Sequence, residues 1–245
     1  MPQPILHSQL ATRVDRFVAK TDLARLYKEY SWDRDSHADG FPDILRLEKQ
    51  LSRGARQKGV TLQDVRDVVA WGGGPSQSRI VGPITVLRPS DLYDDRRQGP
   101  PPPGLLLQPL EALLDLRYVG PTYASKVLRF AMPEHYGAID SWCVRVFGQG
   151  DPAAKKQDWL QLQASPSNKS KNRWGILEKK RAGWPHGYGV WLAILRHIAS
   201  TLAVPCPHPP IFTKEGLRRM GQWTCADVEM ALFTYASQQV HAVGR

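Results

Sequence analysis

The chain has 245 residues, of which 42% are hydrophobic and eight are tryptophan, so we expect a folded protein, either one large domain or a two-lobed unit. Its net charge of +10 favours a polyanionic partner, most simply nucleic acid. No run of about 18 apolar residues occurs, and the N-terminus has no signal-peptide core, so we expect a cytoplasmic protein, or a nucleoid-associated one in a bacterium, with no membrane contact.

The wide spacing of the three cysteines, Cys143, Cys206 and Cys225, favours free thiols over a disulfide framework. Three thiols cannot supply the clustered cysteine ligands of an iron–sulfur cluster. The chain also has no CxxC pair and no HxE followed by PCxxC, which are common zinc-binding patterns. We therefore expect no metal and no other cofactor.

The N-terminal part of the chain is expected to be helical. Apolar residues recur at helical spacing over residues 8–30, and again from Leu45 to a stop at Gly54 or Gly59. Thr61 and Asp64 then resemble a capping box before another helix, which the glycines at 72–74 end. Residues 31–40 are a polar interruption, and residues 72–82 are predicted to be a flexible loop.

A helical hairpin is predicted between residues 105 and 130. After the proline run at 100–103, which is typical of a stiff connector, leucines at helical spacing form a first helix that ends near Leu116. Val119-Gly120-Pro121 makes a sharp turn into a second helix, which runs to about Phe130. We expect Gly120 to take the positive φ of the turn, and Pro121 suits the first helical position. Free N–H groups at this helix N-terminus are a natural phosphate site.

Asp140 follows this hairpin at a defined distance. It lies 140 − 120 = 20 residues after Gly120, directly before the short apolar-periodic segment 141–147. An aspartate in this position can cap the next helix, and capping alone would be a sufficient structural reason for it.

The segment after Gly150 is strongly basic. Residues 155–181 contain eight lysines and arginines and two acids, and Lys169, Lys171 and Arg173 are our candidates for contacts to a phosphate backbone. A solvated basic loop is the alternative, since residues 165–172 are polar and loop-like. Two further helices are predicted, over about 191–202 and from about 225. No convincing run of strands occurs, so we predict an all-α fold.

The hairpin and the spaced acid together resemble the helix-hairpin-helix DNA glycosylase superfamily, which includes endonuclease III, MutY and AlkA-type enzymes. Leu116, Val119 and Gly120 match the hairpin of that family, and Asp140 falls on its catalytic acid. The match covers about 35 residues, to Phe147. Two positions depart from the pattern: Arg117-Tyr118 stand where the family often has Pro-Gly, and Thr122 stands where its bifunctional members have a nucleophilic lysine.

The resemblance implies a two-lobed helical fold with a DNA-binding cleft between the lobes. Residues 1–60 and 150–245 would form one lobe. Residues 61–149 would form the other, with the hairpin at 105–130 and the segment of the catalytic acid at 137–147. The partner would be double-stranded DNA with a flipped base, bound by a monomer.

The implied function is hydrolysis of the N-glycosidic bond of a damaged, mispaired or modified base, leaving an abasic site, in repair or in defence against modified foreign DNA. Asp140 would stabilise the positive charge on the sugar and orient or deprotonate the attacking water. Thr122 favours a monofunctional enzyme. Lys126 lies one helical turn after Thr122, so a bifunctional glycosylase and lyase that uses Lys126 is one alternative. A non-catalytic DNA-binding protein is another.

Further residues are predicted to contact the DNA or the base. At the hairpin we expect DNA contacts from Tyr118, Val119, Gly120, Thr122 and Tyr123. In the 72–82 loop, Gln77 and Arg79 are candidates for contacting DNA or filling the gap that a flipped base leaves. Trp142, Tyr136 and His135 are our candidates for the base pocket.

Overall fold

The computed structural model describes residues 6–83, 87, 103–167, 170–177 and 186–243. These residues form ten α-helices, one short 3-10 helix and two small two-stranded sheets, so the structure is mostly helical, in agreement with the predicted class. No helix of the described part is long and apolar enough to cross a membrane.

The first half of the chain contains most of the predicted helices at close to the expected positions. The elements are α1 (Ser8–Val18), α2 (Leu23–Lys28), β1 (Ser31–Trp32), β2 (Asp35–Ser36), α3 (Pro42–Gln57), α4 (Leu62–Trp71) and the 3-10 helix η1 (Gln77–Arg79). The helical segment predicted over residues 8–30 is two helices, because Asp22 starts a new one by accepting a hydrogen bond from the amide of Arg25.

The second half contains the hairpin helices and the C-terminal helices. The elements are α6 (Pro103–Leu114), α7 (Pro121–Ala131), α8 (Ser141–Phe147), β3 (Ala164–Ser167), β4 (Ser170–Ile176), α9 (His186–Thr201), α10 (Pro210–Lys214) and α11 (Cys225–Val243). The predicted proline connector lies outside the described residues except for Pro103, the first residue of α6.

One expectation about the local structure of a polar segment is wrong. Of the residues 165–172, which we expected to be a loop, residues 165–167 belong to β3 and residues 170–172 to β4; the two strands are antiparallel, with Pro166 paired with Trp174 and Ala164 with Ile176. Serine, lysine and asparagine have low strand propensity, so tertiary pairing decides this segment rather than composition. The polar interruption at 31–40 does separate α2 from α3, and it contains the short β1–β2 pair. Residues 72–82 form a loop as expected, apart from η1.

The predicted capping box at the start of α4 is confirmed. The Thr61 hydroxyl accepts from the amide of Asp64, and the Asp64 carboxylate accepts from the amide of Thr61 at 2.8 Å. These bonds satisfy two N–H groups at the first turn of α4. They fix where α4 begins, and its last residue, Trp71, reaches the candidate site described below.

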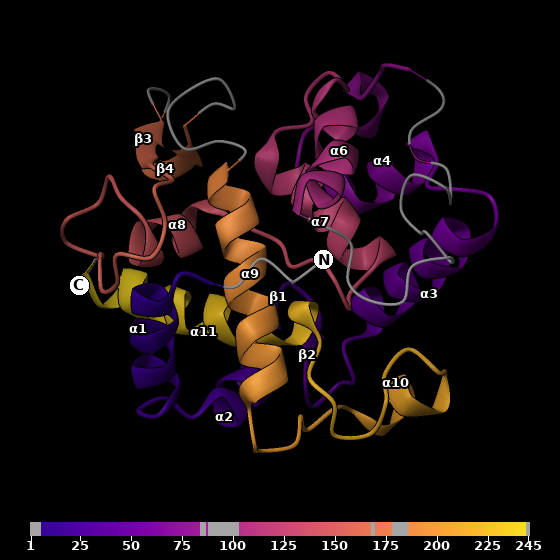
Figure 1. Cartoon of the computed structure of the whole chain (residues 1–245). Coiled ribbons are helices and arrows are strands. Elements are labelled where there is room, and N and C mark those ends of the chain that lie inside the picture. The colour runs from indigo at the N-terminus through magenta and orange to yellow at the C-terminus, as the bar shows by residue number, and fades with distance from the viewer. Residues whose placement is uncertain (1–5, 84–86, 88–102, 168–169, 178–185, 244–245) are drawn as a thin grey trace.

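Two groups of helices are visible in Figure 1. Helices α3, α4 and α6 pack against α7, and α11 packs against α2, α8 and α9. The predicted domain boundaries at residues 60 and 150 stay a prediction. Two helices pack across these predicted boundaries. Helix α3, from the lobe predicted to include residues 1–60, packs against α7, and α8, from the lobe predicted to span residues 61–149, packs against α11. A contiguous core of buried apolar side chains runs through both groups.

Candidate active site

The helical hairpin has the predicted helices but a different turn conformation. Leu116 and Val119 are buried, and Gly120 is the N-terminal cap of α7 with Pro121 in its first turn. Gly120 has φ −91° and ψ 179°, so the expectation of a positive φ there is wrong. The left-handed residue is Tyr118, with φ 66°. The left-handed residue therefore lies two positions earlier than expected, and a residue as bulky as tyrosine is strained in this backbone conformation.

The residues of this turn differ in what they can offer to DNA. Tyr118 is 48% exposed, and the Arg117 guanidinium lies over its ring at 5.1 Å from the centroid. Val119 is buried, so it could reach DNA only through its backbone. No side chain caps the N-terminus of α7, and Thr122 is half-buried in its first turn. The N-terminus of α7 is therefore available to a phosphate.

Asp140 caps α8, as predicted. Its Oδ1 accepts a hydrogen bond from the amide of Cys143 at 2.9 Å, and its backbone is extended, with φ −125°. Burial raises the pKa of Asp140, while the Cys143 amide and the Lys126 ammonium act in the opposite direction. The carboxylate is half-buried at a helix N-terminus, where a negative charge is favoured.

The segment before Asp140 is held by hydrogen bonds from two helices. Tyr188 and Trp191 of α9 donate to the carbonyl oxygens of Gly137 and Ala138, at 3.1 and 2.9 Å. From α7, the Ser125 hydroxyl accepts from the amide of Ile139 at 3.0 Å. All of these donors and acceptors are buried, so the position of Asp140 is fixed relative to both α7 and α9.

A small pocket lies beside Asp140. It is lined by Tyr30, Trp32, Trp71, Lys126, Arg129, Ala138, Asp140, Glu229 and Phe233. Its free volume is about 10 Å³, roughly what one water molecule needs. The two residues predicted to be catalytic, Asp140 and Lys126, therefore share one pocket. Sequence reasoning missed the contribution of Arg129 and Glu229 to it.

Lys126 occupies the aromatic end of this pocket. It is 8% exposed, and its Nζ lies 4.6 Å from the centroid of Trp32 and 4.9 Å from that of Trp71. The two indoles are fixed by hydrogen bonds, from Trp32 Nε1 to the Trp71 carbonyl at 3.3 Å and from Trp71 Nε1 to Asp35 at 2.7 Å. Burial lowers the pKa of Lys126, against the opposing effect of Asp140. A cation between two indole faces is a favourable arrangement.

Behind the pocket lies a buried network of ion pairs that the sequence analysis did not detect. Arg129 contacts Glu48 at 3.4 Å and Glu229 at 3.3 Å. Arg218 contacts Glu48 at 2.7 Å and Asp227 at 3.0 Å. The five side chains come from α3, α7, α11 and the segment before α11. A signal was present, since Arg129 stands between Leu128 and Phe130 in an otherwise apolar part of α7.

The three aromatic residues predicted for the base pocket do not line the pocket beside Asp140. Trp142 stacks on Phe233 with centroids 5.5 Å apart, behind the pocket wall. Tyr136 is buried in the core, and burial raises the pKa of its hydroxyl. Burial lowers the pKa of His135, which is half-buried. Closeness to Asp140 in the sequence therefore did not place these side chains in its pocket.

The aromatic wall is formed instead by Tyr30, Trp32, Trp71 and Phe233. Trp32 belongs to the β1–β2 pair and Trp71 is the last residue of α4, so these residues come from segments far from Asp140 in the sequence. Tertiary packing brings them to the acid.

The remaining predicted DNA contacts lie on exposed or partly exposed surface. Gln77 and Arg79 are exposed on η1. Arg173 is exposed on β4. Burial raises the pKa of Tyr123, and the charge of Arg173 acts in the opposite direction, so these two residues are near each other. The Tyr123 ring lies against Gly72 and Gly74, where a Cβ would collide with it. Lys169 and the side chain of Lys171 lie outside the described residues.

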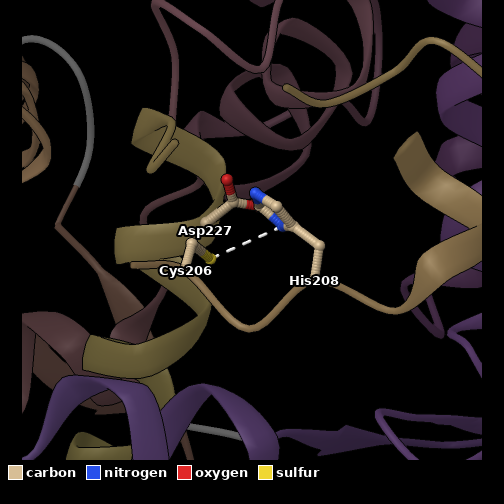
Figure 2. Close-up of side chains that lie close together, drawn as sticks. All are labelled: Cys206, His208 and Asp227. Atoms are coloured by element: carbon tan, nitrogen blue, oxygen red, sulfur yellow. Dashed lines mark hydrogen bonds between the residues drawn. The ribbon is translucent and has the colours of Figure 1, made fainter. Parts of the chain in front are cut away.

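One group of side chains has the donor atoms of a zinc site. Figure 2 shows the side chains of Cys206, His208 and Asp227 close together. Their ligand atoms all lie within 4.8 Å of one another. His208 donates from Nε2 to the Gln222 carbonyl at 2.8 Å, and its Nδ1 lies 3.5 Å from the Cys206 sulfur. Burial raises the pKa of Cys206, whereas metal binding needs the thiolate. Both oxygens of Asp227 accept from Arg218, so we assign this group to packing and charge pairing.

Comparisons with family models, with curated proteins and with solved structures gave no match for this chain.

Proposed function

We propose that the chain is a DNA glycosylase that hydrolyses the N-glycosidic bond of a damaged, mispaired or modified base and leaves an abasic site. The observation that carries this proposal is the position of Asp140. Its carboxylate is fixed at the N-terminus of α8, beside a pocket with a volume of about one water molecule, and 20 residues after the turn of a helical hairpin.

The chemistry needs the features that surround Asp140. As the base leaves, positive charge develops on the sugar, and a fixed carboxylate next to C1′ stabilises that charge. The same carboxylate can orient or deprotonate the attacking water. Lys126 and the Cys143 amide favour the ionised form of Asp140. An acid held between these groups suits this role better than a freely moving surface acid.

DNA would bind along the hairpin and over the cleft that we propose between the two lobes of a monomer. The exposed Tyr118, the N-terminus of α7 and Arg173 would contact the phosphate backbone of a duplex. A flipped base needs more room than the pocket offers, so side chains such as Lys126 must move when it binds. Cytoplasmic or nucleoid localisation, and a role in repair or in defence, follow from the same proposal.

A panel of duplexes tests the function directly. Each duplex would carry one altered base, including oxidised, alkylated, deaminated, mispaired and hypermodified bases. We expect release of free base from at least one duplex, detected by mass spectrometry, together with an alkali-labile abasic site. If the protein binds the duplexes but releases base from none of them, the chain is a DNA-binding protein without glycosylase activity.

A second candidate function is favoured by the position of Lys126. Its amine shares the pocket with Asp140, and burial lowers its pKa. An amine there could attack C1′ and displace the base, which leaves with the electron pair of the C1′–N bond. Opening of the sugar ring would give a Schiff base, and loss of a C2′ proton would expel the 3′ phosphate.

Reduction with borohydride separates the two mechanisms. We expect wild type to release base without a covalent DNA adduct, because Thr122 stands at the family's lysine position and Lys126 is held as a cation between two indoles. An adduct that Lys126→Ala abolishes would establish the lyase mechanism. The exposed Lys28 on α2 provides the matched control, and Lys28→Ala should behave as wild type.

A non-catalytic DNA-binding protein is the remaining alternative. For such a protein, the affinity for DNA should fall steeply with salt concentration, because it depends on phosphate contacts, and no base should be released. A helical adaptor for other proteins would show no salt-dependent DNA binding at all.

A further inference from the structure

The candidate site and the ion network behind it contain more carboxyl groups than cations. The carboxyl groups are those of Glu48, Asp140, Asp227 and Glu229, and the cations are Lys126, Arg129 and Arg218. If all are ionised and His208, which lies beside Asp227, is counted as neutral, 4 − 3 = 1 negative charge has no partner. Because an unpaired buried charge is costly, this group should hold one proton at neutral pH.

The hydrogen bonds identify Glu229 as the carboxyl that holds it. Arg218 donates two bonds to Glu48 and two to Asp227, and Asp140 accepts from a backbone amide. Glu229 accepts one weak bond, from Arg129 to Oε2 at 3.3 Å, and no described residue donates to its Oε1. Protonation therefore costs Glu229 the least. Burial raises the pKa of Glu229 to about 7, against Arg129 and with a further rise from Asp140.

Charged and titratable groups from α7, α8, α9 and the segment after α2 surround Glu229, which is the carboxyl of the pocket with the weaker hydrogen bonding. They are Lys126 and Arg129 of α7, Asp140 and Cys143 at the start of α8, Tyr30 after α2, and Tyr188 of α9. Burial raises the pKa of Cys143 and of both tyrosines, so these three stay neutral. A further buried acid, Asp35, is stabilised separately by two amides at the start of α3 and by the Trp71 indole.

We propose that Glu229 carries a proton at neutral pH and donates it to the base that leaves from the site of Asp140. As the C1′–N bond breaks, its electron pair remains on the base, and the Glu229 proton moves to the base. Water attacks C1′ and loses its proton to the ionised Asp140, and solvent later restores the proton of Glu229. Two carboxyl groups with different charge states thus have two roles. The donor role rests on the proposed function, whereas the bound proton does not.

The bound proton can be tested without DNA. The chain has seven glutamates, so carbon-13 labelling of their carboxyl groups gives a small set of NMR signals, and the Glu229 signal is the one missing from Glu229→Gln. We expect this signal to titrate with a midpoint near 7, well above the ordinary range for glutamate. A midpoint of about 4 to 5, the ordinary range, would overturn the proposal.

The donor role is tested by the pH dependence of base release. The wild-type rate should fall as pH rises through about 7, because Glu229 loses its proton there. Glu229→Gln keeps an acceptor for Arg129 but has no acidic proton, so its rate should be about a hundredfold lower and independent of pH in this range. Glu229→Asp should recover part of the rate and the pH dependence.

Equal rates and equal pH profiles for wild type and Glu229→Gln would overturn the donor role. If wild type releases no base from any duplex, the proposed function fails instead. The NMR titration then still decides whether Glu229 holds the proton, so the two failures are distinguishable.

Discussion

Asp140→Asn is expected to slow base release by about 10²–10⁴-fold while DNA affinity stays within a few-fold of wild type. Asparagine has nearly the shape of aspartate and can still accept the hydrogen bond from the Cys143 amide, so the cap of α8 is retained. What it lacks is the negative charge beside C1′ and the ability to take a proton from water. Single-turnover release of base and a binding titration at the same salt concentration measure the two quantities.

Asp22→Asn is the matched control for this variant. Asp22 caps α2 in the same way, accepting from the amide of Arg25 at 2.9 Å, but it does not line the pocket. It should release base at the wild-type rate. If Asp140→Asn also does so, Asp140 is a helix cap alone, and the catalytic assignment is wrong. If both variants lose activity together, the effect belongs to the loss of charge on capping residues rather than to the site.

Local sequence patterns predicted the helices and their ends because those signals lie within a few residues of each other. Thr61 and Asp64 are three residues apart, and their capping box forms as expected. Asp140 likewise caps α8 through an amide three residues away. Such capping bonds join residues three positions apart, so they depend on local backbone geometry more than on tertiary packing.

The turn of the hairpin was predicted less well for a related reason. Glycine tolerates a positive φ but does not require it, so Gly120 alone could not locate the left-handed residue. Tyr118 adopts it because buried Leu116 and Val119 anchor the chain on both sides. Tyrosine normally prefers a negative φ, and the packing of these two neighbours outweighs that preference. The β3–β4 hairpin, formed by polar residues, is a second case in which packing decides against local preference.

The candidate site was predicted only in part because most of its wall is non-local. Asp140 and Lys126 could be identified from the hairpin and its spacing, and they do share a pocket. Trp32, Trp71 and Glu229 reach the same pocket from the β1–β2 pair, the end of α4 and α11. A side chain's direction depends on the packing of its helix. For that reason Trp142, close to Asp140 in sequence, points to Phe233 and not into the pocket.

The buried ion network connects parts of the chain that are far apart in sequence. Glu48 is on α3, Arg129 on α7 and Asp227 on α11, and Arg218 binds two of the three. Burial favours the neutral form of Asp227, but Arg218 reverses this and lowers its pKa. Because this folded-state pKa is lowered, the pair stabilises the protein above the unfolded-state pKa, and that contribution is lost as pH falls through the folded-state value.

Arg218→Met is therefore expected to destabilise the protein by about 3–5 kcal/mol, since it keeps the volume of the side chain but leaves Glu48 and Asp227 without their cation. For a chain of this size, the melting temperature should fall by roughly 6–20 °C at pH 7, and stability should depend less on acidic pH than in wild type. Arg25→Met is the control, because Arg25 pairs with Glu29 on the surface with its side chain 61% exposed; it should change stability by less than about 1 kcal/mol. Thermal unfolding followed by circular dichroism measures both variants. Equally small shifts in melting temperature for the two variants would show that the network joining α3 and α11 contributes no more to stability than a surface ion pair. The argument that the charges of this network must balance around Glu229 would then lose its basis.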